Sequence, residues 1–340
     1  TSITGGEPLI LVDNVPMSAD EFSRINAQDI DNISVLKDAS SAAIYGARAS
    51  FGVILVTTKR GEGEKVRINY SGNLSINNMS NLPELITDPY TVANWKNIAG
   101  NGWYTFLDDE TLEYARRRSE DPSLPSAYLS VAQPETWQYL GSVNWFDAAF
   151  KKNSFVHNHN VNISGTTQKL SYYFSAEYYN NNGILQVGSD HYNRYNLRNK
   201  LEYKLTDWLE LGTNLSYTHY SNDEPYNLDY FFHNLNRTNT LDLIHNPDGS
   251  WTDSGAGMIG HLAEGGRSES KSGNFQGTFS GTLSLIKNVL TIKANATYRK
   301  KNLKKHNWDM PVYQKKGPDT PETMTTYDPF TAIPFSSKYS

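Results

Sequence analysis

The sequence contains no cysteine among its 340 residues, and no long run of apolar residues. The first absence excludes disulfides, thiolate metal sites and cysteine nucleophiles. The second excludes a membrane-spanning helix, which needs roughly 18 to 20 predominantly apolar residues in a row. The mean hydropathy of −0.59 agrees with this exclusion. It does not exclude a membrane β-barrel, because strands that alternate apolar and polar residues average to a hydrophilic composition.

Basic clusters and catalytic motifs are also scarce. The 31 Lys and Arg residues are outnumbered by 36 Asp and Glu, which gives a formal net charge of −5. A nucleic-acid partner would favour a clustered basic face, so none is expected. His157 and His159 share one face of a predicted strand, but two ligands do not make a metal site. We therefore expect neither an enzyme nor a bound metal or cofactor.

The first 62 residues are expected to form a small mixed α/β unit. A short apolar strand at 8–12 stops at a turn of Asp13, Asn14 and Pro16. An alternating strand over 33–36, helical turns over 40–46 and a β-branched strand over 53–58 follow. The opening residues 1–8 are neither basic nor apolar, so they do not resemble a signal peptide. Either the protein is cytosolic or the chain is a mature or partial one.

From Lys65 onward the sequence alternates strictly between apolar and polar residues. Val66, Ile68 and Tyr70 interleave with Arg67 and Asn69, which is typical of a strand with one apolar face. Seven segments share this pattern, each about as long as a tilted strand needs to cross a bilayer: 65–77, 155–165, 169–179, 192–205, 209–220, 271–285 and 289–300. Many of the 22 tyrosines lie on the apolar faces, where their rings suit lipid contact and interfacial girdles.

The connections between these segments alternate between short and long. Three of them are turns of three or four residues around Thr166, Asp207 and Lys287. The long loops are expected at 78–154, 180–191, 221–270 and 301–340. Outer-membrane barrels combine tight periplasmic turns with long extracellular loops. A soluble β-sandwich also alternates its faces but has no reason to sort its loops by length, so we favour the barrel.

Several motifs resemble a known family. They are PLILVDNVP at 8–16, ISVLKDAS at 33–40, AIYGAR at 43–48 and GVILVTTK at 52–59. In order and spacing they closely resemble the plug domain of SusC/RagA-type TonB-dependent outer-membrane transporters. Three later pieces are similar to the same family's first barrel strands: NWFD at 144–147, YNRYNLR at 192–198 and TDWL at 206–209. The resemblance covers almost the whole chain.

This resemblance implies a mainly β fold, with a small α/β plug domain inside a large antiparallel transmembrane β-barrel. Residues 1–62 would be the C-terminal part of the plug, and residues 65–340 would supply about seven of about 22 barrel strands. Seven strands alone would leave backbone groups unpaired in hydrocarbon. No TonB-contact segment or N-terminal extension is recognisable, so we expect a partial chain of an outer-membrane protein.

The family further implies import of an oligosaccharide, a glycan or a peptide. Its implied partners are a SusD-like surface lipoprotein, the TonB energy-transducing complex and outer-membrane lipids. Two alternatives stay open at this point. One is a siderophore-type TonB-dependent receptor, and the other is a soluble β-rich carbohydrate-binding protein.

Two sets of side chains are candidates for function. Aromatic and polar residues in the loop at 221–270 would suit stacking on a sugar or peptide, or would simply pack the loop or touch the lid protein: Tyr226, Asp229, Tyr230, His233, Arg237 and Trp251. Charged residues are expected to join plug and barrel: Lys37, Asp38, Arg48, Lys59 and Arg67. The polar inner face that would surround the plug also includes Asn69, Lys200, Glu202, Lys293 and Arg299.

Overall fold

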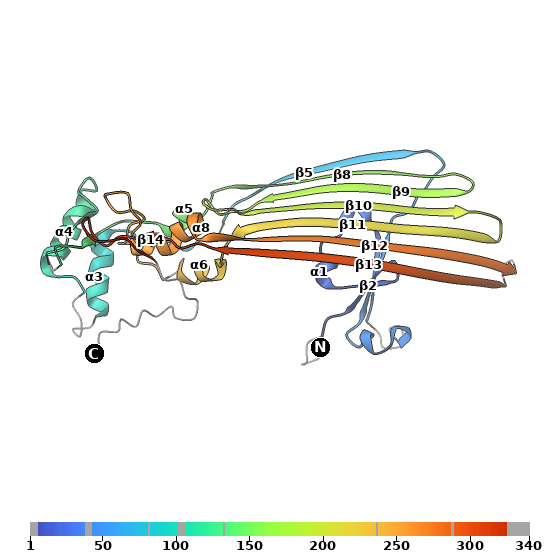
Figure 1. Ribbon diagram of the computed structural model, residues 1–340, viewed down its shortest axis with the longest axis horizontal. Coiled ribbons are helices and arrows are strands. Elements are labelled where there is room, and N and C mark those ends of the chain that lie inside the picture. Colours follow the sequence, from blue (N-terminus) through green and yellow to red (C-terminus); the bar gives the residue numbers. More distant parts are fainter. Residues whose placement is uncertain are drawn as a thin grey trace.

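The computed structural model describes residues 6–37, 43–80, 82–100, 106–131, 133–235, 237–286 and 289–324. Figure 1 shows three parts: one long sheet, a small unit against one face of this sheet, and a layer of short helices beyond one end of it. We call the small unit the plug (residues 9–58). The layer of helices and loops beyond the sheet is called the loop layer (residues 82–150, 226–265 and 310–324).

The plug is a mixed four-stranded sheet of order β2-β1-β4-β3. β1 runs parallel to β4, and the other pairs are antiparallel. The two residues between β1 and β2, Asp13 and Asn14, have φ of 47° and 67°, as a tight hairpin turn of this length requires. The bounds are β1 Leu9–Val12, β2 Val15–Met17, α1 Ala19–Phe22, η1 Ala27–Asp29, β3 Ile30–Leu36, η2 Ala43–Ala49 and β4 Val53–Thr58.

Seven long strands form one antiparallel sheet in the order β13-β12-β11-β10-β9-β8-β5. The predicted fold class, a plug followed by about seven barrel strands, is confirmed. The strands are β5 Arg67–Asn77, β8 Ser154–Thr166, β9 Leu170–Asn182, β10 His191–Lys204, β11 Leu209–Pro225, β12 Gly266–Ile286 and β13 Leu290–Asp309.

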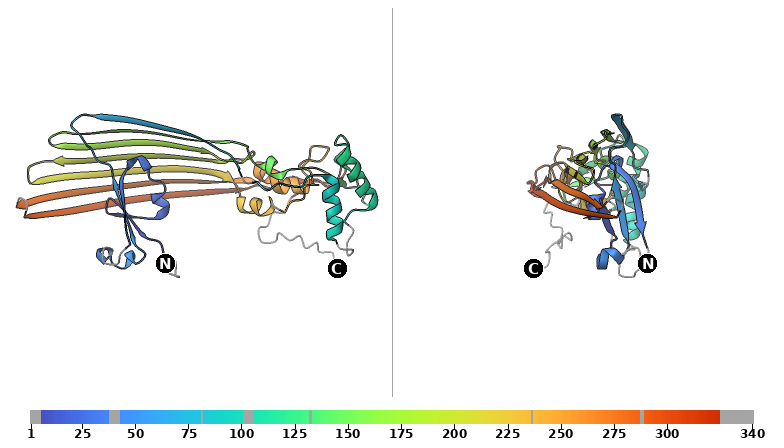
Figure 2. Two further views of the ribbon diagram at one scale, coloured as in Figure 1. Left: turned by 180° about the vertical axis from the view of Figure 1, so that it is seen from behind. Right: turned by 90° about the vertical axis from the view of Figure 1, so that its right-hand side faces the viewer.

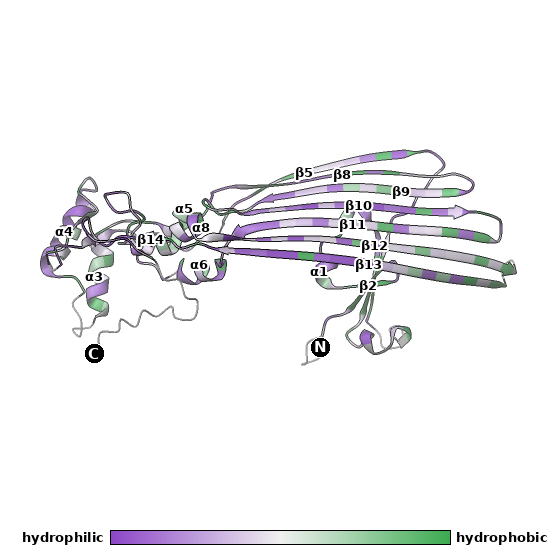
Figure 3. Ribbon diagram, in the orientation of Figure 1, coloured by the Kyte–Doolittle hydropathy of each residue, from purple (hydrophilic) through white to green (hydrophobic). Residues whose placement is uncertain are grey.

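The hairpin of β12 and β13 is longer than its alternation predicts. Residues 266–270 and 301–309, which were expected to be loop, continue the ladder up to the pair Gly266 and Asp309. Both extensions are mostly polar on both faces, with Leu303 and Trp308 as isolated apolar residues, so they lack the sustained period-two signal that identifies the other strands. Figure 3 shows this hydrophilic stretch along the loop-layer half of β13.

The two faces of the large sheet differ as the alternation predicts. On the face toward the plug, Asn160, Asn196 and Arg198 are buried. On the opposite face, which we call the outward face, Val161 and Leu197 are exposed. The end-on view in Figure 2 shows the plug strands on one side of the sheet only. Within the described ranges, no helix combines the length and the apolar character that a membrane span requires.

The loop layer is a folded unit with its own cores. Trp145, Phe150 and Phe231 are buried together with Leu262, and the indole of Trp145 donates to the carbonyl of Asn239 at 3.0 Å. A second core gathers Ala93, Ala115, Leu140 and Leu241. The elements are α3 Pro89–Ala99, α4 Asp109–Glu120, β6 Ala127–Leu129, β7 Trp137–Tyr139, α5 Trp145–Ala149, α6 Leu228–Leu235, α7 Asp253–Gly255, η3 Ala256–Gly260, α8 His261–Glu264, β14 Tyr313–Gln314 and β15 Thr323–Met324.

Candidate functional site between plug and sheet

The contact between the plug and the large sheet is built from charged and polar side chains. Carboxylates lie mainly on the plug side, at Asp13, Glu21 and Asp29. Their cationic partners project from β10 and β13. The two sides are therefore complementary in charge, and the contact differs in kind from the apolar cores within the plug itself.

Asp29 is the most enclosed of these carboxylates, with 2% of its surface exposed. It ends η1, whose N-cap Asn26 turns the chain so that Asp29 points at the sheet. The hydroxyl of Tyr173 donates to its Oδ1 at 2.9 Å, and Nε of Arg198 donates to its Oδ2 at 3.3 Å. Asn26 adds a longer bond of 3.4 Å. A buried carboxylate is tolerated because its charge is paired and its oxygens accept hydrogen bonds.

Asp13 lies in the hairpin turn between β1 and β2 and links plug and sheet in a second way. Its carboxylate accepts from the backbone N–H of Thr58 at 3.0 Å and from Nδ2 of Asn214 at 2.7 Å. Lys200 Nζ approaches it at 3.5 Å and Arg198 Nη1 at 3.8 Å. Arg198 therefore stands between the two plug carboxylates. The guanidinium of Arg198 joins both plug carboxylates to the large sheet, which we also call the wall.

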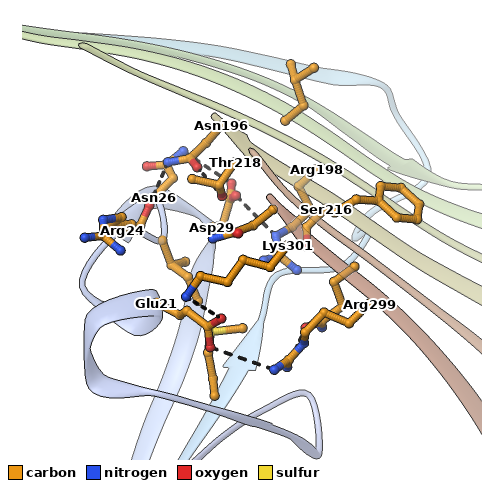
Figure 4. A pocket seen from close by; sticks show the side chains of 16 residues that line it. Glu21, Arg24, Asn26, Asp29, Asn196, Arg198, Ser216, Thr218, Arg299 and Lys301 are labelled. Atoms are coloured by element: carbon orange, nitrogen blue, oxygen red, sulfur yellow. Dashed lines mark hydrogen bonds and ion pairs between the residues drawn. The ribbon is translucent and has the colours of Figure 1, made fainter. Parts of the chain in front are cut away.

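Glu21 forms a third link, toward β13. Arg299 and Lys301 approach its carboxylate at 3.8 and 3.6 Å. Burial acts to raise the pKa of Glu21, but the hydrogen bonds from Ser18 and the two cations outweigh it and lower the pKa. Arg299 also donates to the carbonyl of Pro16 at 2.6 Å. Figure 4 shows the carboxylate turned toward both cations.

A small cavity of about 50 Å³ lies in the middle of this interface. Its lining combines plug residues such as Glu21, Arg24 and Asp29 with wall residues such as Asn196 and Thr218 (Figure 4). Met17, Ile25 and Phe275 also line it, so the cavity has both polar and apolar walls, and its volume has room for a small number of waters. The cavity thus lies next to the groups that hold the plug in place.

The cations predicted to join plug and barrel are placed elsewhere. Lys37 and Arg48 are exposed on the plug, and Arg67 is exposed at the start of β5. Lys59 donates its backbone N–H to the carbonyl of Asp29 at 2.8 Å. In the described part of the chain, none of these four side chains takes part in a bond between plug and sheet. Asp38 lies outside the described residues, and the five assignments stay predictions.

The sequence alone predicts some, but not all, of the side chains that join the plug to the large sheet. Lys200 and Arg299 were assigned to the inner face by alternation, and both reach the plug. Asp13, Glu21 and Asp29 were missed, because in the sequence Asp13 reads as a turn residue and Glu21 and Asp29 as helix-terminal acids. These three carboxylates lie in turns or short helices next to strands of the plug. Acidic residues at such positions are equally common in solvated loops, so the sequence does not identify them as contacts.

The predicted ligand-binding residues fall into two groups in the loop layer. Asp229, His233 and Arg237 are exposed on α6 and just after it, and Arg237 Nη1 lies 2.8 Å from Nε2 of His233. The others pack inside the layer. The ring of Trp251 packs at a tilt against that of His245 with centroids 4.0 Å apart, and the carbonyl of Tyr226 lies 2.8 Å from Nε2 of His261. Tyr230 is half-buried, and this burial raises its pKa.

A mixed plug held by ion pairs against the polar face of a two-faced antiparallel sheet defines the class of TonB-dependent receptors. Residues 2–53 match the family model described as the TonB-dependent receptor plug domain. TonB-dependent receptor P26 of Formosa agariphila is 31% identical over 255 residues, which are 74% of this chain and 23% of that protein. TonB-dependent receptor SusC of Bacteroides thetaiotaomicron is 31% identical over 193 residues, 54% of this chain and 16% of SusC.

Solved structures agree on the fold. The RagAB peptide importer in its closed-closed state matches with a TM-score of 0.69 at 23% identity, over 92% of this chain and 36% of that one. Within this class, the chain is similar to SusC in sequence and to the RagAB importer in fold. It spans about a quarter of the length of the curated relatives that it matches, or less.

Proposed function

We propose that this polypeptide is part of an outer-membrane importer that takes up a nutrient through a plugged barrel, using energy delivered by TonB. The observation that carries the proposal is the contact of the plug with the polar face of the sheet through Asp13, Asp29 and Arg198. The opposite, apolar face of the same sheet suits lipid. A wall with one face for lipid and one for a polar plug fits a gated channel in a membrane.

The charged contact suggests how the channel would open. Ion pairs and hydrogen bonds such as those of Asp29 can be exchanged for bonds to water while the plug is pulled, one contact after another. An apolar contact of equal area would instead expose its whole surface to water. The cavity beside Glu21 and Arg24 would supply a starting point for that exchange. The plug would move or unfold locally, and the substrate would pass without chemical change.

The substrate class we propose is an oligosaccharide or glycan, or a peptide, delivered with a SusD-like surface lipoprotein. Relatives named SusC and the RagAB peptide importer support this range, although each name speaks only for the protein that carries it. Within the chain, the exposed side chains of Asp229, His233 and Arg237 offer both charges and a ring on one surface of the loop layer. We propose that this surface contacts the ligand or the lipoprotein.

Uptake in the native host tests the proposal. A deletion strain complemented with the gene would be grown on single oligosaccharides, on defined peptides, or with ferric siderophores as the sole iron source, with and without functional TonB. We expect complementation to restore growth on a saccharide or a peptide only when TonB is functional. Restoration by ferric siderophores alone, or uptake without TonB, would contradict the proposal. Purification from the same strain should recover a surface lipoprotein with the importer.

A further inference from the structure

Three lysines gather on the outward face of the hairpin of β12 and β13, near the loop layer: Lys271, Lys300 and Lys304. Their register places them on the same face as the exposed rings of Phe275 and Tyr298, whereas Ser272 and Gln276 between them are buried toward the plug. All three lysines are exposed. We call them the lysine cluster.

The arrangement of the cluster is electrostatically unfavourable by itself. Lys271 lies directly opposite Lys304 in the ladder, and like charges in that position repel each other. Glu269 pairs with Lys271 at 2.6 Å. Within the described ranges, no carboxylate pairs with Lys300 or Lys304. The cluster therefore has a surplus of positive charge, which an external anion would neutralise.

The height of the cluster along the strands indicates where that anion would lie. The facing pair Lys271 and Lys304 forms the upper level of the cluster, whereas Lys300 lies opposite Phe275 at the upper edge of the apolar part of the outward face, which continues through Phe279 on β12. Lys271 lies four positions before Phe275 on β12, which places it about 13 Å closer to the loop layer along the strand. A row of rings crosses the neighbouring strands between these two levels: Tyr178 stacks on Tyr195 at 5.0 Å, and Tyr195 on His219 at 6.4 Å. Such a row is typical of the border between hydrocarbon and headgroups.

We propose that the lysine cluster binds the phosphate groups of a phosphorylated lipid headgroup in the outer leaflet, while the acyl chains of the same molecule lie over Phe275, Phe279 and Tyr298. A lipid explains both halves of the surface, because a free phosphate ion would have no use for the apolar half. The inference rests on the proposed function in one respect: the outward face must meet the membrane. It adds a ligand site on the outside of the wall, remote from the plug and from the path of the substrate.

The full polypeptide, purified in a neutral maltoside detergent and stripped of lipid, tests the site. Binding of bis-phosphorylated lipid A would be compared with binding of the same lipid after enzymatic dephosphorylation, by native mass spectrometry. Lys271→Gln/Lys304→Gln removes the facing pair. Lys293→Gln/Lys305→Gln is the matched control, because it removes two lysines from the opposite face of the same hairpin.

We expect Lys271→Gln/Lys304→Gln to weaken binding of the phosphorylated lipid roughly thirtyfold, as two lysines near an anionic surface should. The control should stay within about twofold, and millimolar inorganic phosphate should not displace the lipid. Equal binding by both variants, equal binding of the dephosphorylated lipid, or full displacement by inorganic phosphate would overturn the proposal. The proposal would also be overturned if the lipid-free wild type forms dimers and Lys271→Gln/Lys304→Gln does not. The outward face would then bind a second copy of the protein.

Heat-modifiable migration in unheated gels separates this proposal from the proposed function. If the wild type migrates as a folded barrel but does not prefer the phosphorylated lipid, only the lipid site is wrong. If the wild type is extracted without detergent and shows no heat-modifiable form, the membrane wall itself is wrong.

Discussion

Replacing Arg198 by methionine should loosen the plug more than any other single change in the wall. The side chain of Arg198 is 7% exposed and that of Asp29 is 3% exposed. Nε of Arg198 lies 3.3 Å from Oδ2 of Asp29. Removing one partner of a buried pair costs about 3 to 5 kcal/mol, because the other charge is left buried. Tyr173 and Asn26 still donate to Asp29, and Lys200 still faces Asp13. The expected loss is therefore near the lower end, about 3 kcal/mol.

Hydrogen exchange in the purified full-length protein measures this loss. Amides of β4 should exchange by transient release of the plug, so their rate follows the opening equilibrium. A loss of about 3 kcal/mol corresponds to roughly 150-fold faster exchange in Arg198→Met. The double variant Arg198→Met/Asp29→Asn should recover part of the protection, since it removes the stranded charge as well.

Arg67→Leu serves as the control for Arg198→Met. Arg67 is exposed at the start of β5, and an exposed charge typically contributes less than about 1 kcal/mol. Its exchange should stay within about fivefold of the wild type. The reasoning fails if the amides of β4 exchange at the same rate in Arg198→Met and Arg67→Leu, because the buried pair of Arg198 and Asp29 would then not contribute to holding the plug.

Three further expectations concern the wall and the loop layer. Ala296→Lys, on the outward face, should impair barrel assembly because a lysine near the bilayer midplane costs roughly 2 to 4 kcal/mol, whereas Asn295→Lys on the inner face should assemble normally; heat-modifiable migration distinguishes the two. Burial lowers the pKa of His261, so the unfolded loop layer takes up a proton more readily. The stability of the loop layer should be constant above about pH 6.5 and should fall as the pH drops below that value. His261→Gln should remove this dependence of stability on pH, as measured by thermal melts at pH 7.5 and 5. Phe231→Ala should cost the loop layer about 3 to 5 kcal/mol in chemical denaturation, whereas Asp229→Ala should leave its stability unchanged within about 0.5 kcal/mol and weaken capture of ligand or lipoprotein instead. Equal destabilisation by Phe231→Ala and Asp229→Ala would contradict the placement of α6.

The sequence was sufficient to predict the large sheet because its signal is local. A strand with one apolar and one polar face repeats every two residues, and the alternation predicts the ends of β8 and β10 to within one residue and those of β9 to within three. The signal disappears where both faces are polar. This is why alternation alone predicts loops where β12 and β13 extend toward the loop layer.

The plug contact could not be predicted in the same way, because its partners are far apart in the chain. Asp29 meets Tyr173 and Arg198 across 144 and 169 positions, and no local pattern connects them. Alternation correctly placed Lys200 and Arg299 on the inner face but could not say which of the inner cations the plug would touch. That choice depends on how the plug is oriented against the sheet, which is a tertiary property.

The loop layer shows a third limit. Residues 221–270 mix aromatic, acidic and amide side chains without a period, so exposure could not be separated from packing. In the structure Trp251 and Tyr226 support the layer, whereas Asp229 and Arg237 are left on its surface.

Fractionation of the native host tests the central claim most directly, because the account requires the large sheet to be a membrane wall. The native polypeptide would be followed by antibody through buffer extraction and detergent extraction of outer membranes, and run on gels before and after heating. We predict that it stays in the membranes until detergent is added and migrates faster unheated than heated. Release into buffer, with a single mobility in both samples, would contradict the account, and the alternating strands would then belong to a soluble sheet.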